Sequence, residues 1–277
     1  MNTIYLNGCS FTLGAGLPDC HLDSVSIQSA IGSLIKHNLK LDYYWNESRS
    51  GGSNDRVTRK TIDFLSKHKN TWDDILVVIG WTQFTRFELI DELEIANEKS
   101  DSKYIQVNSG ISHTRKSGDE NTFFTHMLDS LSSMRKIVRF GFGRDFVGGD
   151  NGIDVEKSWA SFMVRHYNVE DRYDKYLDNI LYLQSFLKSN NIKYVMFDSL
   201  WSINETKLSS KFLQKYQLID FDRWVWGDNK TSWTEYLQLI DPTNEKTRIS
   251  WNNDHPNEYG HKIWSELIIK KVKQLYG

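Results

Sequence analysis

The amino-acid sequence predicts an α/β protein, a three-layer α/β/α sandwich built on a parallel central sheet. The first observation is that short apolar, β-branched runs alternate along the chain with segments of helical periodicity. The second is the run ILVVI at residues 75–79, which is continuous and apolar, as expected of a strand that helices cover on both faces. Such alternation favours a parallel sheet, because right-handed crossovers return each helix onto the sheet.

Four segments are predicted to be strands and four to be helices. The strand segments are short runs rich in β-branched and aromatic residues, at residues 3–7, 42–45, 75–79 and 193–197. The helical segments carry apolar residues at helical spacing, at residues 24–38, 54–68, 156–189 and 258–275. We expect one domain, residues 1–277, with insertions at about 88–187 and 201–251, because no clean linker separates them.

Composition excludes several classes of protein. The 277 residues carry 34 Lys+Arg against 36 Asp+Glu, a formal net charge of -2, so the basic excess of a nucleic-acid or membrane-surface protein is lacking. The two cysteines lack the spacing of a disulfide framework or a metal site. No signal peptide and no apolar stretch of about 18 residues is evident. The expectation is a soluble cytoplasmic protein without a metal.

A turn at Gly8-Cys9-Ser10 follows the first predicted strand. Ligands of open α/β sheets gather at the carboxyl ends of the strands. A serine at this point can present its hydroxyl as a nucleophile, with the N–H groups of the turn beside it as an oxyanion site. The alternative is that Ser10 only caps the segment that follows it.

A second candidate lies near the end of the chain, where Asp254, His255 and Pro256 precede the last predicted helix. Pro256 is expected in the first turn of that helix, which leaves His255 in the loop before it. A histidine held there can act as a general base with a carboxylate nearby. The alternative is a capping loop at the surface.

A third turn, NESRSGGSN at residues 46–54, follows the second predicted strand. Gly51 and Gly52 allow the backbone to approach a ligand and to offer N–H donors. Ser53 or Asn54 is expected to cap the next helix. An ordinary strand-to-helix turn is the alternative.

A fourth turn follows the strand at residues 75–79 and contains Thr82 and Gln83. In a parallel sheet these polar side chains lie at the same edge as Ser10, although an ordinary turn has the same composition. Three arginines follow the third and fourth turns and can hold an anionic substrate or serve structure alone; they are Arg56, Arg59 and Arg86.

In this order the four turns resemble the sequence blocks of the SGNH/GDSL-like hydrolase superfamily, over roughly the first 85 and the last 30 residues. The residues of these motifs are similar to those of divergent SGNH proteins, which tailed bacteriophages and environmental bacteria often encode. The matching blocks are Gly8-Cys9-Ser10 (block I), Asn46 to Gly51 (block II), Gly80-Trp81-Thr82-Gln83 (block III) and Asn252-Asn253-Asp254-His255-Pro256 (block V).

The resemblance implies an SGNH/flavodoxin-like fold and a serine hydrolase, usually an esterase or deacetylase that acts on small O-acyl groups, often on carbohydrates. Ser10 would attack the acyl carbonyl, and His255 would take its proton and pass it to the leaving alcohol. The N–H groups of Ser10 and Gly51 would bind the oxyanion with a third donor from Thr82 or Gln83. Asn54 and the arginine at position 86 are further substrate-binding candidates. No cofactor is implied.

Two positions depart from the family pattern. Thr82 stands where the family has an oxyanion asparagine, with Gln83 beside it as a replacement donor. Asn252 stands where the family has the aspartate that orients the histidine. Whether Asn252 or Asp254 orients His255 therefore stays open. The protein is a serine–histidine dyad helped by a carbonyl or by Asp254, or a slow enzyme, or it has another role.

Two other functions remain open beside an O-acyl (acetyl) esterase. One is a non-catalytic SGNH-fold protein that binds a glycan or a partner protein, and the other is an acyltransferase that excludes water from the acyl-enzyme. The expected partner is a small ester or acylated glycan, without nucleic acid or membrane, and an oligomer can form through the insertion. The location is the cytoplasm, the host's if a phage encodes the chain. Tryptophans that can stack on sugars or fill the core are Trp201, Trp224, Trp226, Trp233 and Trp251.

Overall fold

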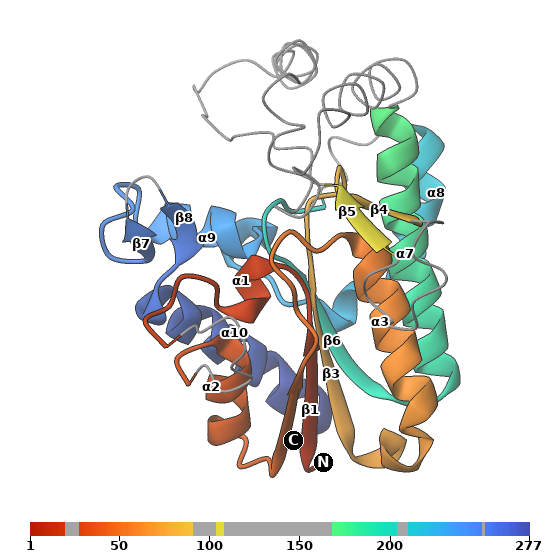
Figure 1. Cartoon of the computed structure of the whole chain (residues 1–277), viewed down its shortest axis with the longest axis horizontal. Coiled ribbons are helices and arrows are strands. Elements are labelled where there is room, and N and C mark those ends of the chain that lie inside the picture. The colour runs from red at the N-terminus through yellow and green to blue at the C-terminus, as the bar shows by residue number, and fades with distance from the viewer. Residues whose placement is uncertain (20–27, 91–103, 108–167, 204–209, 251–252) are drawn as a thin grey trace, which may run out of the picture. The chain divides into compact units, whose positions relative to one another are not determined.

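The computed structural model describes residues 1–19, 28–90, 104–107, 168–203, 210–250 and 253–277. They belong to two compact units, one made of Met1–Phe84 with Asp174–Gly277 and the other of Thr85–Tyr173. In the second unit, strands β4 (Phe87–Ile90) and β5 (Tyr104–Val107) pair antiparallel. The central sheet and the helices that cover it lie in the first unit (Figure 1).

The central sheet has four strands, all parallel, in the order β2-β1-β3-β6. The α/β class with a parallel central sheet is therefore confirmed, and each strand lies where the sequence predicts it. Every residue of β1 and β3 is buried, as expected of inner strands that helices cover on both faces. The strands are β1 (Thr3–Asn7), β2 (Tyr43–Asn46), β3 (Ile75–Trp81) and β6 (Lys193–Asp198).

Helices cover both faces of this sheet (Figure 1). On one face, Ile4 and Leu6 of β1 belong to the same buried cluster as Trp264 of α10. On the other face, Tyr5 stacks on Phe64 of α3 with ring centroids 4.5 Å apart. Because side chains alternate along a strand, β1 supplies both layers of the core. The covering helices are α2 (Ile31–Asn38), α3 (Asn54–Lys67), α7 (Val169–Ser189) and α10 (Glu258–Tyr276).

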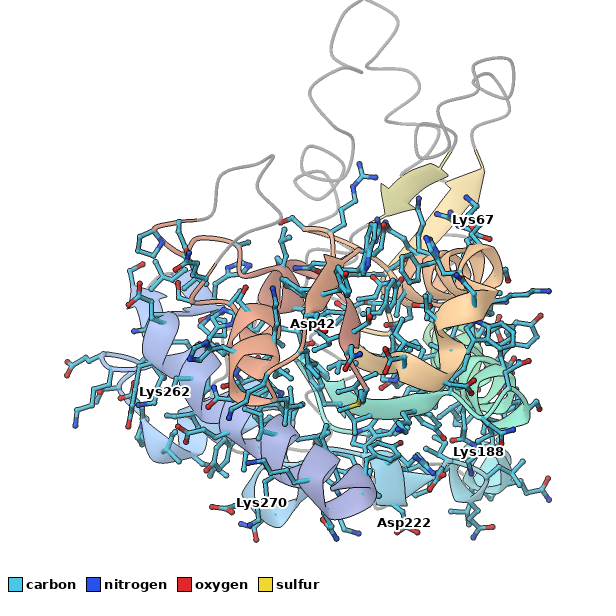
Figure 2. All side chains as sticks on the ribbon, turned by 90° about the horizontal axis from the view of Figure 1, so that it is seen from below. Asp42, Lys67, Lys188, Asp222, Lys262 and Lys270 are labelled. Atoms are coloured by element: carbon cyan, nitrogen blue, oxygen red, sulfur yellow. The ribbon has the colours of Figure 1, made fainter. Side chains whose placement is uncertain are left out.

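The residue pattern of α10 decides which of its sides faces the sheet. Trp264, Ile268 and Val272 recur at a spacing of four residues and are buried in the core. Lys262 and Lys270 are exposed and project from the outer side of the helix (Figure 2). Burial of each large apolar side chain contributes about 1.5–3 kcal/mol, which holds the helix to the sheet.

The helix predicted at residues 24–38 is shorter in the structure. Residues 20–27 lie outside the described residues, and α2 begins only at Ile31. The carboxylate of Asp19 accepts a hydrogen bond from the N–H of Gln28 at 2.7 Å. The same carboxylate accepts from the Ser29 hydroxyl at 3.1 Å, so Asp19 binds the residues just before the helix.

Pro256 does not begin the last helix, contrary to the prediction. The N-cap of α10 is Asn257, whose side-chain oxygen accepts from the Gly260 N–H at 3.0 Å. Pro256 and His255 lie before that cap in a two-stranded antiparallel hairpin rather than in a loop. Its strands are β7 (Arg248–Ser250) and β8 (Asn253–Pro256).

The segment predicted as an insertion at residues 201–251 supplies part of the core. Trp233 is fully buried, and its ring stacks on Trp264 with centroids 5.9 Å apart. The N–H of Val225 donates to the carbonyl of Met196 at 2.7 Å, which covers the open edge of β6. The single domain and its insertion boundaries stay a prediction. The remaining elements of the first unit are α1 (Ser10–Leu13), η1 (Lys69–Asp74), α8 (Ser210–Gln217), η5 (Phe221–Arg223), η6 (Asp228–Lys230) and α9 (Trp233–Ile240).

Candidate active site

The candidate site lies where the strand order reverses. Chain connections run from β1 through α2 to β2, and from β2 through α3 to β3, so the chain changes faces around β1. Open α/β sheets bind ligands in the crevice at the carboxyl ends of the strands beside such a point. Here those ends belong to β1 and β3, and the turns that follow them carry Ser10 and Thr82.

Ser10 is the first residue of α1 and follows β1 after two residues only. Glycine is required at position 8, because a Cβ there would lie 2.0 Å from the Thr12 hydroxyl oxygen and 2.7 Å from the Gly80 carbonyl oxygen. The close approach turns the chain sharply and leaves the Ser10 side chain 7% exposed. Its backbone N–H belongs to the first turn of a helix, where N–H groups have no partner within the helix.

The structure brings Ser10 and His255 together across 245 positions of sequence. The Nε2 atom of His255 lies 2.8 Å from the Ser10 Oγ atom, within hydrogen-bond distance. For the hydroxyl to donate to Nε2, the imidazole must be neutral with its proton on Nδ1. This is the arrangement in which the imidazole can take the serine proton.

Aromatic rings fix the histidine from one side. The ring of Phe11, the residue after Ser10, lies 5.0 Å from the His255 ring between centroids. Phe11 in turn meets the edge of buried Trp233 at 5.9 Å. The core thus reaches directly behind the imidazole, and its packing restricts the ring to few orientations.

The turn after β2 is tied to the turn after β1. The N–H of Arg49 donates to the carbonyl of Gly8 at 3.1 Å, and the N–H of Gly52 donates to the carbonyl of Arg49 at 2.9 Å. Gly51 has a φ of 73°, a conformation that favours glycine, and a Cβ there would meet nothing within 4 Å. The predicted oxyanion glycine therefore borders open space beside the serine turn.

Asn54 joins the turn after β2 to the turn after β3. Its side-chain oxygen accepts from the Thr82 N–H at 2.9 Å, and its amide group donates to the Thr82 carbonyl at 3.1 Å. The N-cap of α3 is the preceding residue, Ser53, which accepts from the Arg56 N–H at 3.2 Å. Asn54 thus has a structural role toward the backbone of Thr82, and its substrate-binding role stays a prediction.

Thr82 and Gln83 lie at the carboxyl end of β3, as predicted, and both are buried. The pairing with Asn54 uses the backbone of Thr82, so a contribution to the oxyanion site from this residue would come from its hydroxyl. The arginine at position 86 belongs to the second unit. Its role toward the substrate stays a prediction.

Asp254 does not orient His255 through its carboxylate. The two residues are neighbours in β8, and adjacent side chains of a strand point to opposite faces. The Asp254 side chain is exposed, and no hydrogen bond joins it to the imidazole. Asn252 lies outside the described residues, so its predicted orienting role stays a prediction.

A second histidine, His261, is buried behind the site. Its Nδ1 atom accepts from the Ile31 N–H at 3.2 Å, so the ring is neutral. Burial, and to a lesser extent the charge of His255, lower the pKa of His261 to about 3. The ring meets Trp233 edge-on at 4.9 Å. Sequence reasoning missed this residue, although its place on the inner side of α10 is a usable signal.

A buried carboxylate at the end of β6 was also missed. Asp198 accepts hydrogen bonds from the Tyr176 hydroxyl and, at 2.9 Å, from the Ile203 N–H. Burial raises the pKa of Asp198 to about 7, although both hydrogen bonds oppose the rise. The aspartate closes the turn after β6, which carries Trp201. Its position after an apolar strand is the sequence signal for it.

Two of the five tryptophans considered for sugar stacking serve the core instead. Trp224 and Trp233 are buried and cannot offer a face to a ligand. Trp226 is half-buried and stacks on Trp224 at 5.6 Å. Trp201 is half-buried at the carboxyl edge of the sheet, 6.5 Å from the ring of Phe84. Trp251 lies outside the described residues.

Of the other predicted cationic side chains, Arg56 has a structural role. Arg56 is buried and donates to the carbonyl of Glu47 at 2.6 Å, which holds the turn after β2. Arg59 is half-buried on α3. Within the described part of the chain, no three His, Cys, Asp or Glu side chains gather as a metal site would require. Every helix there is too short or too polar to cross a bilayer.

Comparison with known proteins gives a match of part of the chain to one family model, and several distant structural likenesses. A family model described as a family of unknown function (DUF6071) matches residues 18–108. No curated protein matches the chain.

Several solved esterases and lipases are similar to the chain at low identity. The psychrotrophic esterase EstA from Pseudoalteromonas sp. is 12% identical with a TM-score of 0.45, covering 99% of this chain and 98% of that one. An acetyl xylan esterase, AlAXEase, is 13% identical with a TM-score of 0.42, covering 99% and 100%. Other similar structures carry the name of the GDSL type, which the sequence motifs resemble. Likeness at this distance assigns no substrate and no residue role, so the site is argued from its own geometry.

Proposed function

We propose that this protein is a serine hydrolase of the SGNH type, an O-acyl (acetyl) esterase that acts on a carbohydrate or similar small ester. The observation that carries the proposal is the 2.8 Å distance between the His255 Nε2 atom and the Ser10 Oγ atom. Its place at the carboxyl ends of β1 and β3, where open sheets bind ligands, supports it.

The reaction would proceed through an acyl-enzyme. Ser10 Oγ attacks the acyl carbonyl carbon while His255 Nε2 takes the hydroxyl proton. The tetrahedral intermediate collapses, the bond to the alcohol oxygen breaks, and the imidazolium returns the proton to that oxygen. Water then attacks the acyl-enzyme with His255 again as the base, which releases the acid and restores the serine.

Backbone N–H groups would stabilise the oxyanion. The Ser10 N–H lies at the start of α1, and the Gly51 loop is hydrogen-bonded to the Gly8 carbonyl through Arg49. Thr82 or Gln83 would add a third donor, and removal of one such donor typically costs about 100-fold in rate or more. Asn252 is the proposed acceptor for the Nδ1 proton, in place of the carboxylate of Asp254.

The substrate class is the finer part of the proposal. Trp201, half-buried at the carboxyl edge of the sheet, is our candidate among the described tryptophans for stacking on a sugar ring. The acetyl xylan esterase among the similar structures is an example of that substrate class. A cytoplasmic location, assembly through the insertion and the lack of a cofactor stay predictions.

The test is hydrolysis of a panel of p-nitrophenyl esters and of acetylated xylo-oligosaccharides by the wild type and Ser10→Ala. We expect S10A to lower the rate by about 1000-fold or more. A fluorophosphonate should label the wild type and leave S10A unlabelled. Equal residual rates in the two proteins would remove Ser10 from the mechanism.

A non-catalytic glycan-binding protein is the second candidate function. The observation that favours it is that the carboxylate next to His255, that of Asp254, makes no hydrogen bond to the imidazole. That protein would resist the fluorophosphonate and would bind its glycan equally well after the S10A substitution. An acyltransferase would instead be labelled and would transfer the acyl group to an added alcohol.

A further inference from the structure

His255 is carried by a hairpin that cannot hold its shape alone. β7 and β8 have three and four residues and pair only with each other among the described strands. Their register is irregular between Arg248 and Ser250. An isolated pair of strands is marginally stable in water, so the position of His255 must depend on contacts outside the ladder.

Arg248, the first residue of β7, ties the hairpin to the rest of the fold. Its side chain is 4% exposed. One terminal nitrogen donates to the carbonyl of Asp254, the peptide group that immediately precedes His255. The other donates at 3.1 Å to the carbonyl of Thr234 in α9. The planar guanidinium thus fixes the Asp254 carbonyl in β8 relative to the Thr234 carbonyl in α9.

These bonds close a ring of contacts around the candidate site. Thr234 follows Trp233 in α9, and Trp233 packs against Phe11. Phe11 follows Ser10 in α1, and Ser10 meets the imidazole at 2.8 Å. Serine and histidine are therefore joined twice, once through their own hydrogen bond and once through the core and the arginine.

The surroundings of Arg248 indicate a role in geometry rather than in charge pairing. No carboxylate within the described residues lies at ion-pair distance from its guanidinium, although burial of a charge is costly without partners. Burial lowers the pKa of Arg248, and the more distant charges of Asp254 and Asp241 partly offset this. Its hydrogen bonds go to two main-chain carbonyls, which a lysine ammonium cannot bridge in the same plane.

We propose that Arg248 is a positioning residue for the His255 imidazole and acts through the main-chain carbonyl of Asp254. As a statement about catalysis, this rests on the proposed hydrolase function. It also identifies the part of Asp254 that matters to the site, the carbonyl rather than the carboxylate.

The kinetic test uses Arg248→Met and Arg248→Lys, with Lys262→Met as a matched loss of an exposed cation. Active sites are counted by fluorophosphonate labelling, so that an unfolded fraction does not lower the rate per site. We expect R248M to lower kcat per labelled site by about 100-fold, because displacement of a catalytic group by about 1 Å has that cost. KM should stay within about threefold, since no substrate contact is lost. R248K should fall between R248M and wild type, and K262M should match wild type.

A spectroscopic measurement separates this inference from the proposed function. In the wild type, Ser10→Ala should shift the ring-nitrogen resonances of His255 because the hydrogen bond is lost. In R248M, or in R248K if R248M does not fold, S10A should leave those resonances nearly unchanged. Wild-type kcat per labelled site, or a wild-type response to S10A, would overturn the role of Arg248. If the wild type hydrolyses no ester, the hydrolase proposal fails and the resonances alone decide the positioning role.

Discussion

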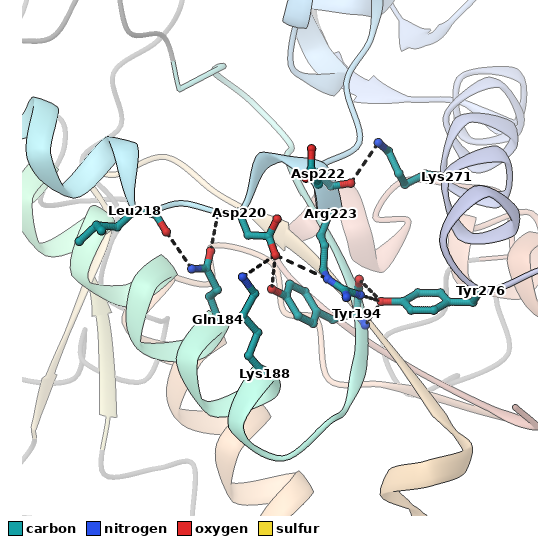
Figure 3. A network of polar contacts seen from close by, with 9 residues as sticks. All are labelled: Gln184, Lys188, Tyr194, Leu218, Asp220, Asp222, Arg223, Lys271 and Tyr276. Atoms are coloured by element: carbon teal, nitrogen blue, oxygen red, sulfur yellow. Dashed lines mark hydrogen bonds and ion pairs between the residues drawn. The ribbon is translucent and has the colours of Figure 1, made fainter.

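The two ends of the central sheet hold their polar groups in different ways. At the amino end of β6 lies a dense set of contacts that we call the Asp220 network (Figure 3). At the carboxyl ends of β1 and β3, a single hydrogen bond joins Ser10 to His255. The residues of the Asp220 network are Gln184, Lys188, Tyr194, Leu218, Asp220, Asp222, Arg223, Lys271 and Tyr276.

In the Asp220 network, Asp220, Arg223 and Tyr276 each make several polar or ring contacts. The Asp220 carboxylate lies 2.6 Å from the Lys188 ammonium and accepts from the Tyr194 hydroxyl at 3.4 Å. The Arg223 guanidinium lies over the rings of Tyr194 and Tyr276, at 5.0 and 5.3 Å from their centroids. The Tyr276 hydroxyl also bonds both the N–H and the carbonyl of Tyr194, each at 3.0 Å. The end of α10 is thereby locked to the edge strand.

The candidate site holds its groups by contacts that also take part in the proposed reaction. Ser10 and His255 share one bond, and the Thr12 hydroxyl beneath them is buried without a partner among the described residues. A nucleophile and its base must exchange a proton and meet a substrate, so they cannot be tied up by many partners. We therefore expect substitutions in the Asp220 network to change stability and substitutions of Ser10 or His255 to change reactivity.

The largest expected effect separates the two ends directly. Asp220→Ala should lower the free energy of unfolding by about 2 kcal/mol, because it removes the acceptor of the Tyr194 hydroxyl and the partner of the half-buried Arg223. Its ester hydrolysis should stay within about twofold of wild type. His255→Gln should do the reverse and lower the rate by about 1000-fold with little change in stability. Urea unfolding measures the free energy of unfolding of each variant, and initial rates measure its ester hydrolysis. A loss of activity in D220A that matches H255Q would break the comparison.

A smaller effect concerns acid stability at the candidate site. His261 has a pKa of about 3 in the folded protein, against an ordinary value of 6.5. Its stabilising contribution is therefore complete above pH 6.5 and is lost as the pH falls toward 3. From pH 7 to pH 5 the loss should be about 2 kcal/mol.

The matched control is His261→Asn, which keeps an acceptor for the Ile31 N–H and does not titrate. Asp198 has a raised pKa and works in the opposite direction, since its stabilising contribution falls as the pH rises toward 7. It is common to both proteins and cancels in their difference. Parallel pH dependences of unfolding for wild type and H261N would show that His261 is not buried as a neutral ring.

The smallest expected effect is that of Asp254→Asn. The exposed carboxylate faces away from the imidazole in β8, while the main-chain carbonyl stays in place for Arg248. We expect kcat/KM to fall by less than about threefold, against about 10,000-fold for loss of an orienting aspartate. The pH profile of kcat/KM should keep its shape. A loss of more than 100-fold in kcat/KM would show that the Asp254 carboxylate takes part in catalysis.

Part of the site was visible in the sequence because its signals are local. Ser10, the glycine at position 8 and the cap at Ser53 belong to short turns, whose geometry depends on neighbouring residues. The strand at residues 75–79 was predicted from its continuous apolar run. Local patterns of this kind determine where a strand ends and a turn begins.

Other parts could not be predicted because they depend on distant partners. The sequence suggested Asn54 as a substrate group, and only the structure shows its amide paired with the backbone of Thr82. Nothing around Arg248 marked it, since its partners Thr234 and Asp254 become neighbours only after folding. Residue type alone does not distinguish a structural side chain from a catalytic one.

By itself the sequence determined the α/β class, the four parallel strands and the turns that hold candidate residues, because apolar periodicity and turn chemistry act over a few residues. Only the tertiary structure decided that residues 245 positions apart in sequence meet at 2.8 Å. That meeting depends on how α9, α10 and the β7–β8 hairpin pack around Trp233. Packing of this kind is a property of the assembled core, and no short segment contains it.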